Sequence, residues 1–238
     1  TIMWLSNSSV GRKVVMSVTG LALVLFLIFH MSMNLAALFS ADAYNQICLF
    51  LGANWYALVA SLMLAALAVI HIFFALWLTL MNRRARGNDR YAVTARPKGV
   101  SWESKNMFVL GVIIFLGLVL HLFNFWSKMQ LAELMGTYEL GIPGVEGPHD
   151  GAGLIRYTFS NPLYVILYII WLVALWFHLN HGFWSALQTL GWNNKIWLKR
   201  IQVISSVVST IVLLGFAAVV CYFFFANLGA NALSFSNF

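Results

Sequence analysis

The chain has 238 residues, of which 61% are hydrophobic and 9% are charged, and its mean hydropathy is +0.83. About a quarter of the residues of a water-soluble domain are charged, so this composition excludes an ordinary soluble globular protein and indicates an integral membrane protein. The net charge of +7 could indicate a nucleic-acid-binding protein, but the charges fall in loops between apolar segments, and we expect no nucleic-acid partner.

Five apolar segments are long enough to cross a bilayer, which takes about 20 helical residues. In chain order they cover residues 14–38, 57–81, 107–127, 162–190 and 201–226. All five should be helices, because an open strand would leave backbone groups unpaired in lipid. The sequence therefore predicts an all-α integral membrane protein, with residues 1–238 forming a single transmembrane domain that is a five-helix bundle.

The basic residues predict the orientation of these segments. Five crossings place all but two of the 14 lysines and arginines on one side, leaving only Lys128 and Arg156 on the other. Because positive charge is retained on the cytoplasmic side, we expect a cytoplasmic N-terminus and an external C-terminus in a bacterial cytoplasmic membrane. The basic loops could also contact acidic membrane lipids.

The first four apolar segments each contain at least one histidine, and the fifth contains none. Ionisable residues are rare inside membranes and usually serve a function there. A single histidine could simply hydrogen-bond a neighbouring helix, but one in each of four consecutive segments favours a shared cofactor. These residues are His30, His71, His121 and, three positions apart in the fourth segment, His178 and His181.

The depth of these histidines groups them into two layers. Counted from the cytoplasmic ends at the helical rise, His30 and His121 lie about 24 and 21 Å deep. His71, His178 and His181 lie about 15, 18 and 14 Å from the same side. The first and third segments therefore supply an outer layer, and the second and fourth supply an inner layer.

Two neutral imidazoles on facing helices are typical of the axial ligands of a haem iron in a helical bundle. Zinc prefers three or four ligands at one point. Two separated pairs favour a bundle that encloses two b-type haems and carries electrons across the membrane. Ala75, Gly117 and Gly182 each lie one turn from a histidine and would leave room for a macrocycle, whereas His30 has Phe26 and Asn34 in those places.

The local sequences IHIFFALW around His71, GLVLHLFNF around His121 and HLNHGFWSALQTLGW around His178 add to this pattern. With the five segments, they resemble the dihaem cytochrome b membrane anchor of succinate:quinone oxidoreductases and quinol:fumarate reductases, in its single-polypeptide form. The resemblance covers about residues 11–226. It implies that His30 and His121 bind a distal haem b, and that His71 and a histidine of the fourth segment, His178 or His181, bind a proximal one.

The resemblance also implies the partners of the chain. Electrons would pass between cytoplasmic iron–sulfur and flavoprotein subunits and a quinone in the membrane, usually menaquinone in the five-helix form. The chain would be an electron-transfer subunit of succinate dehydrogenase or fumarate reductase, without activity toward succinate alone. The sequence does not determine in which direction the complex runs.

The choice between His178 and His181 follows from the same resemblance. The family ligand is followed four residues later by glycine, which His178 has in Gly182, whereas His181 would have Ser185. We therefore expect His178 to bind iron, and His181 to bond a haem propionate or a helix carbonyl, or to be the alternative ligand. Some fumarate reductases have a glutamate two residues before this ligand, where this chain has Trp176, so that proton route is not expected here.

Polar residues before the second segment are candidates for a quinone site, although a solvated loop would explain them equally well. They are Asp42, Tyr44, Asn45 and Gln46. Two other functions remain open: a dihaem anchor of another membrane dehydrogenase, such as hydrogenase or formate dehydrogenase, and a haem-free proton-coupled transporter.

Overall fold

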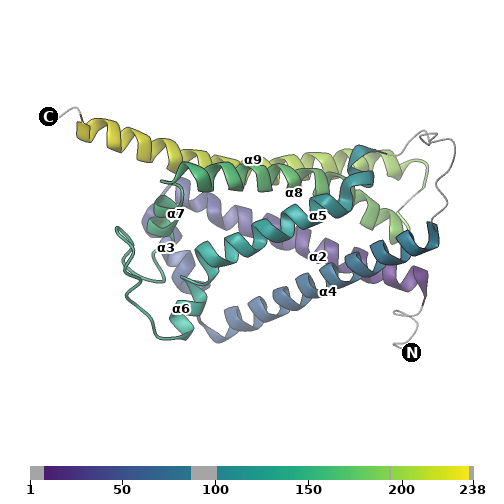
Figure 1. Ribbon diagram of the computed structural model, residues 1–238, viewed down its shortest axis with the longest axis horizontal. Helices are drawn as coiled ribbons and strands as arrows, with labels where there is room; N and C mark the ends of the chain where they lie inside the picture. Colours follow the sequence, from purple (N-terminus) through teal and green to yellow (C-terminus); the bar gives the residue numbers. More distant parts are fainter. Residues whose placement is uncertain (1–7, 87–100, 193, 236–238) are drawn as a thin grey trace. The chain divides into compact units, whose positions relative to one another are not determined.

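A computed structural model describes residues 8–86, 101–192 and 194–235, and the regular structure of those residues is entirely helical (Figure 1). Five of the helices are long and apolar enough to cross a membrane, which indicates a multi-pass membrane protein. They are α2 (Ser9–Leu35), α4 (Trp55–Arg86), α5 (Trp102–His121), α8 (Pro162–Thr189) and α9 (Trp197–Phe235).

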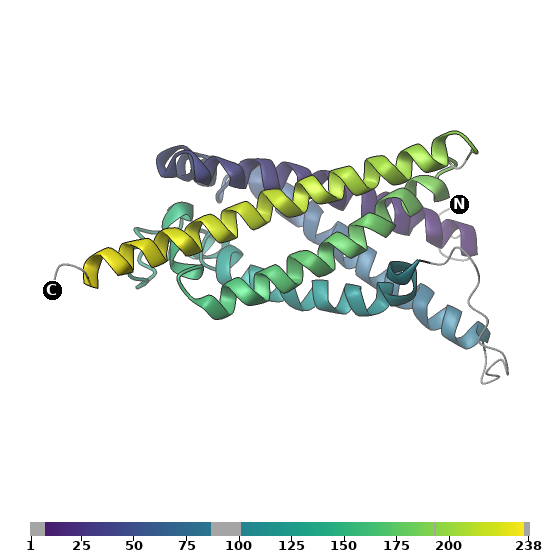
Figure 2. The ribbon, with the colours of Figure 1, turned by 90° about the horizontal axis from the view of Figure 1, so that it is seen from above.

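Each of these helices covers most of one of the five predicted segments, but most of the helix ends differ from the prediction. The first segment ends in a short 3-10 helix, η1 (Ala36–Leu38), and the third ends in a π-helix, η2 (Leu122–Trp126). Figure 2 shows α9 as one continuous helix. It ends at Phe235, nine residues past its predicted end. Four of those nine residues are alanine or leucine, which favour helix, so the helix can continue beyond the apolar segment.

The chain forms two compact units. Unit 1 consists of residues 1–26, 63–112 and 177–209, and unit 2 consists of residues 27–62, 113–176 and 210–238. Each of the five long helices contributes one part to unit 1 and another part to unit 2. His71, His178 and His181 belong to unit 1, whereas His30 and His121 belong to unit 2.

In unit 1, aromatic contacts join the helices. The guanidinium of Arg12 on α2 lies 5.7 Å from the ring centre of Trp77 on α4. Trp102 of α5 and Phe177 of α8 have ring centres 5.1 Å apart. Ile201 of α9 is buried, with 2% of its surface exposed.

In unit 2, two short helices pack against each other: α3 (Ala41–Phe50) and α7 (Gly151–Thr158). The side chains of Ser40 and Asp150 accept hydrogen bonds from the first turns of α3 and α7, respectively. At Gly151 a side chain would collide with Cys48 and Tyr44, so only glycine permits this close approach.

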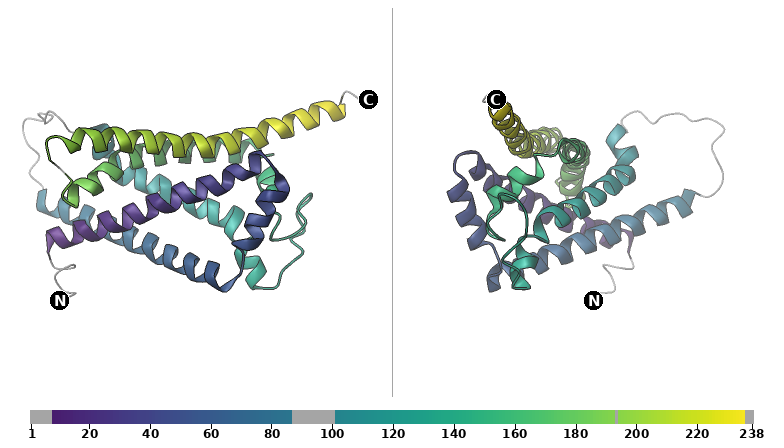
Figure 3. Two further views of the ribbon diagram at one scale, coloured as in Figure 1. Left: turned by 180° about the vertical axis from the view of Figure 1, so that it is seen from behind. Right: turned by 60° about the vertical axis from the view of Figure 1, so that its left-hand side comes forward.

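A further short helix, α6 (Gln130–Leu134), precedes the irregular segment 135–150 that leads into α7, drawn in teal in Figure 3. Two polar side chains connect this region to the turn before α4. Glu133 accepts a hydrogen bond from the backbone N–H of Ala53 at 2.8 Å, and Gln130 donates one to the carbonyl of Gly52 at 3.0 Å.

Candidate functional site: two histidine pairs

The structure brings the intramembrane histidines together in two pairs. His30 on α2 and His121 at the end of α5 have ring centres 5.8 Å apart and ring planes at 86°. His71 on α4 and His178 on α8 have ring centres 6.4 Å apart and ring planes at 69°. These are the two pairs expected from membrane depth with His178 as the ligand, while their role as iron ligands stays a prediction.

The separation within each pair fits two imidazoles that share one metal ion. An imidazole nitrogen binds a metal at about 2.0 Å and lies about 1.1 Å from its ring centre, so two axial rings have centres about 6.2 Å apart. The two observed separations lie on either side of this value. Two imidazole planes can share one ligand–metal–ligand axis whatever the angle between the planes. The interplanar angles of 86° and 69° are therefore compatible with two imidazoles that bind one metal ion.

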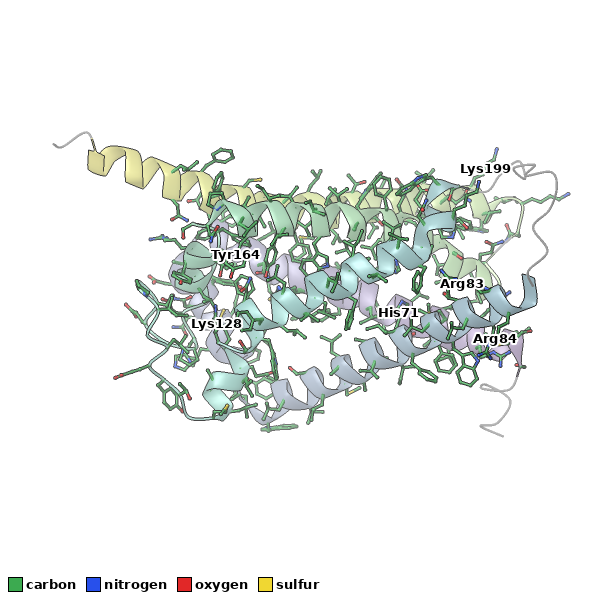
Figure 4. All side chains as sticks on the ribbon, in the orientation of Figure 1. His71, Arg83, Arg84, Lys128, Tyr164 and Lys199 are labelled. Carbon is green, nitrogen blue, oxygen red and sulfur yellow. The ribbon has the colours of Figure 1, made fainter. Side chains whose placement is uncertain are left out.

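In unit 1, His71 faces α2 (Figure 4). Its Nδ1 lies 3.2 Å from the hydroxyl oxygen of Thr19. A Cβ atom added to Gly20 would lie 3.2 Å from Cε1 of His71, so the absence of a side chain at Gly20 lets the imidazole approach α2 closely. Neither Thr19 nor Gly20 was predicted from the sequence to contact His71, because both lie about 50 positions away from it.

The other two histidines of unit 1 differ in their contacts. The Nδ1 atoms of His178 and His181 are buried and have no hydrogen-bond partner in the described part of the chain. A buried polar atom without a hydrogen-bond partner lowers the stability of the folded protein by about 1–3 kcal/mol. We therefore expect another group to bind these imidazoles and orient their rings. His178 faces His71, whereas the ring of His181 lies edge-on to Trp184 with centres 5.1 Å apart.

In unit 2, aromatic side chains surround the pair. His30 lies 5.6 Å from Phe216 of α9, and His121 lies 5.2 Å from Phe125 and 5.6 Å from Trp171, all between ring centres. The π-helix η2 begins directly after His121, and such departures from α-helical geometry are frequent at functional sites.

The two glycines expected to leave room for a macrocycle have side chains beside them. At Gly182 an added Cβ would be in ordinary van der Waals contact with Met107 at 3.9 Å and with the ring of His178 at 4.0 Å. At Gly117 the indole of Trp171 occupies that position, and its Nε1 donates a hydrogen bond to the carbonyl of Ile114 at 3.0 Å. Gly117 thus accommodates a tryptophan in this structure.

Trp176 stands where some relatives of the resembled family have glutamate. Its indole N–H donates a hydrogen bond to the hydroxyl of Thr210 at 3.0 Å. This contact joins α8 to α9 within unit 2. The side chain therefore has a packing role at the position where a proton-carrying carboxylate would stand.

The four quinone candidates have different surroundings. Asp42 is exposed in the first turn of α3. Asn45 joins α3 to α7, because its amide donates to Asp150 at 2.8 Å and accepts from the N–H of Ala152 at 3.0 Å. Gln46 lines a cavity of about 330 Å³ together with Asn45, Leu49, Tyr138, Glu146 and His149.

Tyr44 is buried beside Cys48. Its hydroxyl donates a hydrogen bond to the amide oxygen of Asn34 at 3.0 Å, and the amide N–H of Asn34 donates to the carbonyl of His30 at 2.8 Å. Burial raises the pKa of Tyr44 well above its usual range and raises the pKa of Cys48 to about 11. Both groups are therefore neutral at physiological pH.

Comparisons of the chain with protein families, curated proteins and solved structures found no match. Within the described residues, no group of three or more histidine, cysteine, aspartate or glutamate side chains could hold a metal ion. A bis-histidine haem site would not form such a group, because it uses only two protein ligands.

Proposed function

We propose that the chain is the membrane-anchoring cytochrome b subunit of a succinate:quinone oxidoreductase or quinol:fumarate reductase. The observation that carries this proposal is the pairing of histidines from four membrane-length helices, at separations that suit two axial ligands of one iron. The family resemblance of the local sequences connects such a protein to succinate and fumarate.

Four histidines would hold two haem b groups. His30 and His121 would bind one iron, and His71 and His178 the other. Bound haem supplies reversible one-electron transfer. The chain's own residues surround the imidazoles: Phe125 and Trp171 lie against His121, and Thr19 lies beside His71.

The proposed partners are an iron–sulfur subunit and a flavoprotein subunit on the cytoplasmic side, with menaquinone in the membrane. Basic residues at the predicted cytoplasmic ends would face these subunits and the lipid headgroups. Arg83 and Arg84 lie near the end of α4, and Lys199 lies in the first turn of α9 (Figure 4). Arg90, Arg96 and Lys98 lie outside the described residues.

The experiment that tests the proposal is a reduced-minus-oxidised absorption spectrum of the purified protein with a haem-to-protein ratio. We expect b-type bands and two haems per chain. The complete absence of such bands would overturn the cytochrome proposal and favour a haem-free transporter. A ratio of one would overturn the assignment of two sites.

The identity of the complex needs a second measurement on the protein purified with its partners. A flavin-containing subunit and succinate dehydrogenase activity would support the proposed complex. Co-purification with hydrogenase or formate dehydrogenase subunits would instead assign the same dihaem anchor to another enzyme.

A further inference from the structure

The hydroxyl of Thr19 has three close neighbours but only one proton. Its oxygen lies 2.9 Å from the carbonyl of Val15, 3.1 Å from the carbonyl of Met16 and 3.2 Å from Nδ1 of His71. A carbonyl oxygen can only accept a hydrogen bond. A threonine hydroxyl within a helix commonly donates to the carbonyl four residues earlier, and the distance to the carbonyl of Val15 is the shortest of the three, so we assign the proton of Thr19 to that carbonyl.

This arrangement fixes the proton on the ring of His71. With its own proton directed at a helix carbonyl, the oxygen of Thr19 accepts from Nδ1 of His71, and the backbone of Met16 is a second hydrogen-bond acceptor for this imidazole. Both neighbours favour the tautomer that carries its proton on Nδ1. A neutral imidazole with a proton on Nδ1 has its lone pair on Nε2. Nε2 is the nitrogen that remains available to bind a metal ion.

The ring is also held in place by packing. Gly20, the residue after Thr19, brings the backbone of α2 against the same edge of the imidazole. His178 lies 6.4 Å from His71 between ring centres. The ring is thus confined between α2 and its partner histidine within unit 1.

The surroundings of His30 are different. The amide nitrogen of Asn34 lies 3.5 Å from its Nδ1. That nitrogen already donates to the carbonyl of His30, so it is assigned as the NH₂ group and cannot accept a proton. His71 therefore faces an acceptor at Nδ1, while His30 faces a donor.

We propose that Thr19 is a positioning residue for His71: its hydroxyl oxygen holds the Nδ1 proton, directs the Nε2 lone pair to the iron and makes the imidazole a stronger ligand. This inference rests on the proposed function. A hydrogen bond to the remote nitrogen of a ligating histidine raises its basicity, which favours the oxidised iron. The haem held by His71 should therefore have a lower reduction potential with Thr19 than without it.

The test is a potentiometric titration of the purified complex carrying Thr19→Val, which keeps the shape of the side chain and removes the hydroxyl acceptor, while the backbone acceptor at Met16 remains. We expect one of the two midpoint potentials to rise and the other to stay constant. We also expect affinity for that haem to fall by about 10–100-fold, seen as selective loss of one haem during washing. Thr19→Ser keeps the hydroxyl and should restore the wild-type values.

Thr79→Val is the matched control. Thr79 lies on α4, the helix of His71, and donates the same type of hydrogen bond to the carbonyl of Ala75 at 2.8 Å. It should change neither potential. Equal effects of Thr19→Val and Thr79→Val would show a general packing effect and overturn the inference.

The outcomes separate this inference from the proposed function. A wild-type protein without haem contradicts the function itself. A wild-type protein with two haems, whose potentials and spectra are unchanged by Thr19→Val, leaves the function standing and overturns the role of Thr19.

Discussion

At the scale of single residues, His178 and His181 have different environments although they are only three positions apart on α8. His178 pairs with His71, and His181 lies against Trp184. An axial ligand of the proposed haem must lie opposite a second histidine, so the geometry favours His178 over His181 for that role. The two residues can therefore serve as each other's control.

We expect His178→Ala to lower the haem content from two to one per chain, because it removes one axial ligand. His181→Ala should retain both haems. The measurement is the haem-to-protein ratio of the purified variants, with thermal stability recorded to confirm folding. Two haems in His178→Ala together with one in His181→Ala would reverse the assignment.

Cys48 offers a prediction about pH. Burial raises the pKa of this thiol from 9.0 to about 11, so at pH 8 its thiolate is about 100-fold scarcer than that of an unperturbed thiol. In a Cys221→Ser variant, we expect alkylation by iodoacetamide to be slow at pH 8 and to accelerate toward pH 11. Rapid alkylation of the folded protein at pH 8 would contradict the buried environment of Cys48.

The same shift has a consequence for stability. The folded protein binds the thiol proton more tightly than the unfolded chain does, because its pKa is higher. The contribution of Cys48 to stability is therefore complete below about pH 9 and is lost as the pH rises through about 11.

At the scale of elements, the contact between α3 and α7 depends on Asn45. Its amide bonds both Asp150 and the N–H of Ala152, residues more than 100 positions away in the sequence. The amide thus connects α3 to Asp150, the capping residue of α7. Without it, the carboxylate of Asp150 would lose a hydrogen-bond donor and the N–H of Ala152 would lose its acceptor.

We expect Asn45→Ala to lower the free energy of unfolding by about 1–3 kcal/mol, since it removes two hydrogen bonds at once. Gln46→Ala is the control: its side chain is exposed on the same helix, and its effect should stay within about 0.5 kcal/mol. Thermal unfolding in detergent measures both. If Asn45→Ala instead left stability unchanged and weakened quinone binding, Asn45 would be a quinone ligand.

The helices also show which features of the fold could be predicted from the sequence. The five apolar segments predicted the long helices, because membrane-spanning helices require an uninterrupted apolar stretch of known length. The π-helix after His121 and the extension of α9 to Phe235 were not predicted, because neither has a distinct residue pattern. Asn45 was interpreted as a quinone candidate. Its hydrogen bonds to Asp150 and Ala152 join α3 to α7, and no local sequence pattern predicts contacts between residues so far apart in the chain.

The histidine pairs were predictable for a different reason. Their depths follow directly from counting residues along helices, and a fixed rise per residue converts a position into a depth. The contact between Nδ1 of His71 and Thr19 depends on which faces of α2 and α4 meet. Counting residues along each helix gives depth but does not show which side chains of two helices are neighbours. Thr19 and Trp171 were missed for this reason.

At the scale of the whole molecule, five predicted crossings would put the two termini on opposite sides of the membrane. The distribution of basic residues predicts a cytoplasmic location for the sequence between α4 and α5. We expect alkaline phosphatase, which is active only outside the cytoplasm, to be active when fused to the C-terminus and inactive when fused within residues 87–100. The reverse pattern of activities would contradict the predicted orientation.

The two histidine pairs are interleaved along the chain: the first combines α2 with α5, and the second combines α4 with α8. A ribosome makes these helices in order, so α5 enters the membrane before α8 has been translated. The pair of His30 and His121 therefore gains its second member while His71 still lacks His178. A ligand that needs both rings of a pair could therefore be bound by His30 and His121 once synthesis has passed residue 121, but by His71 and His178 only after residue 178, so the first pair can be completed earlier.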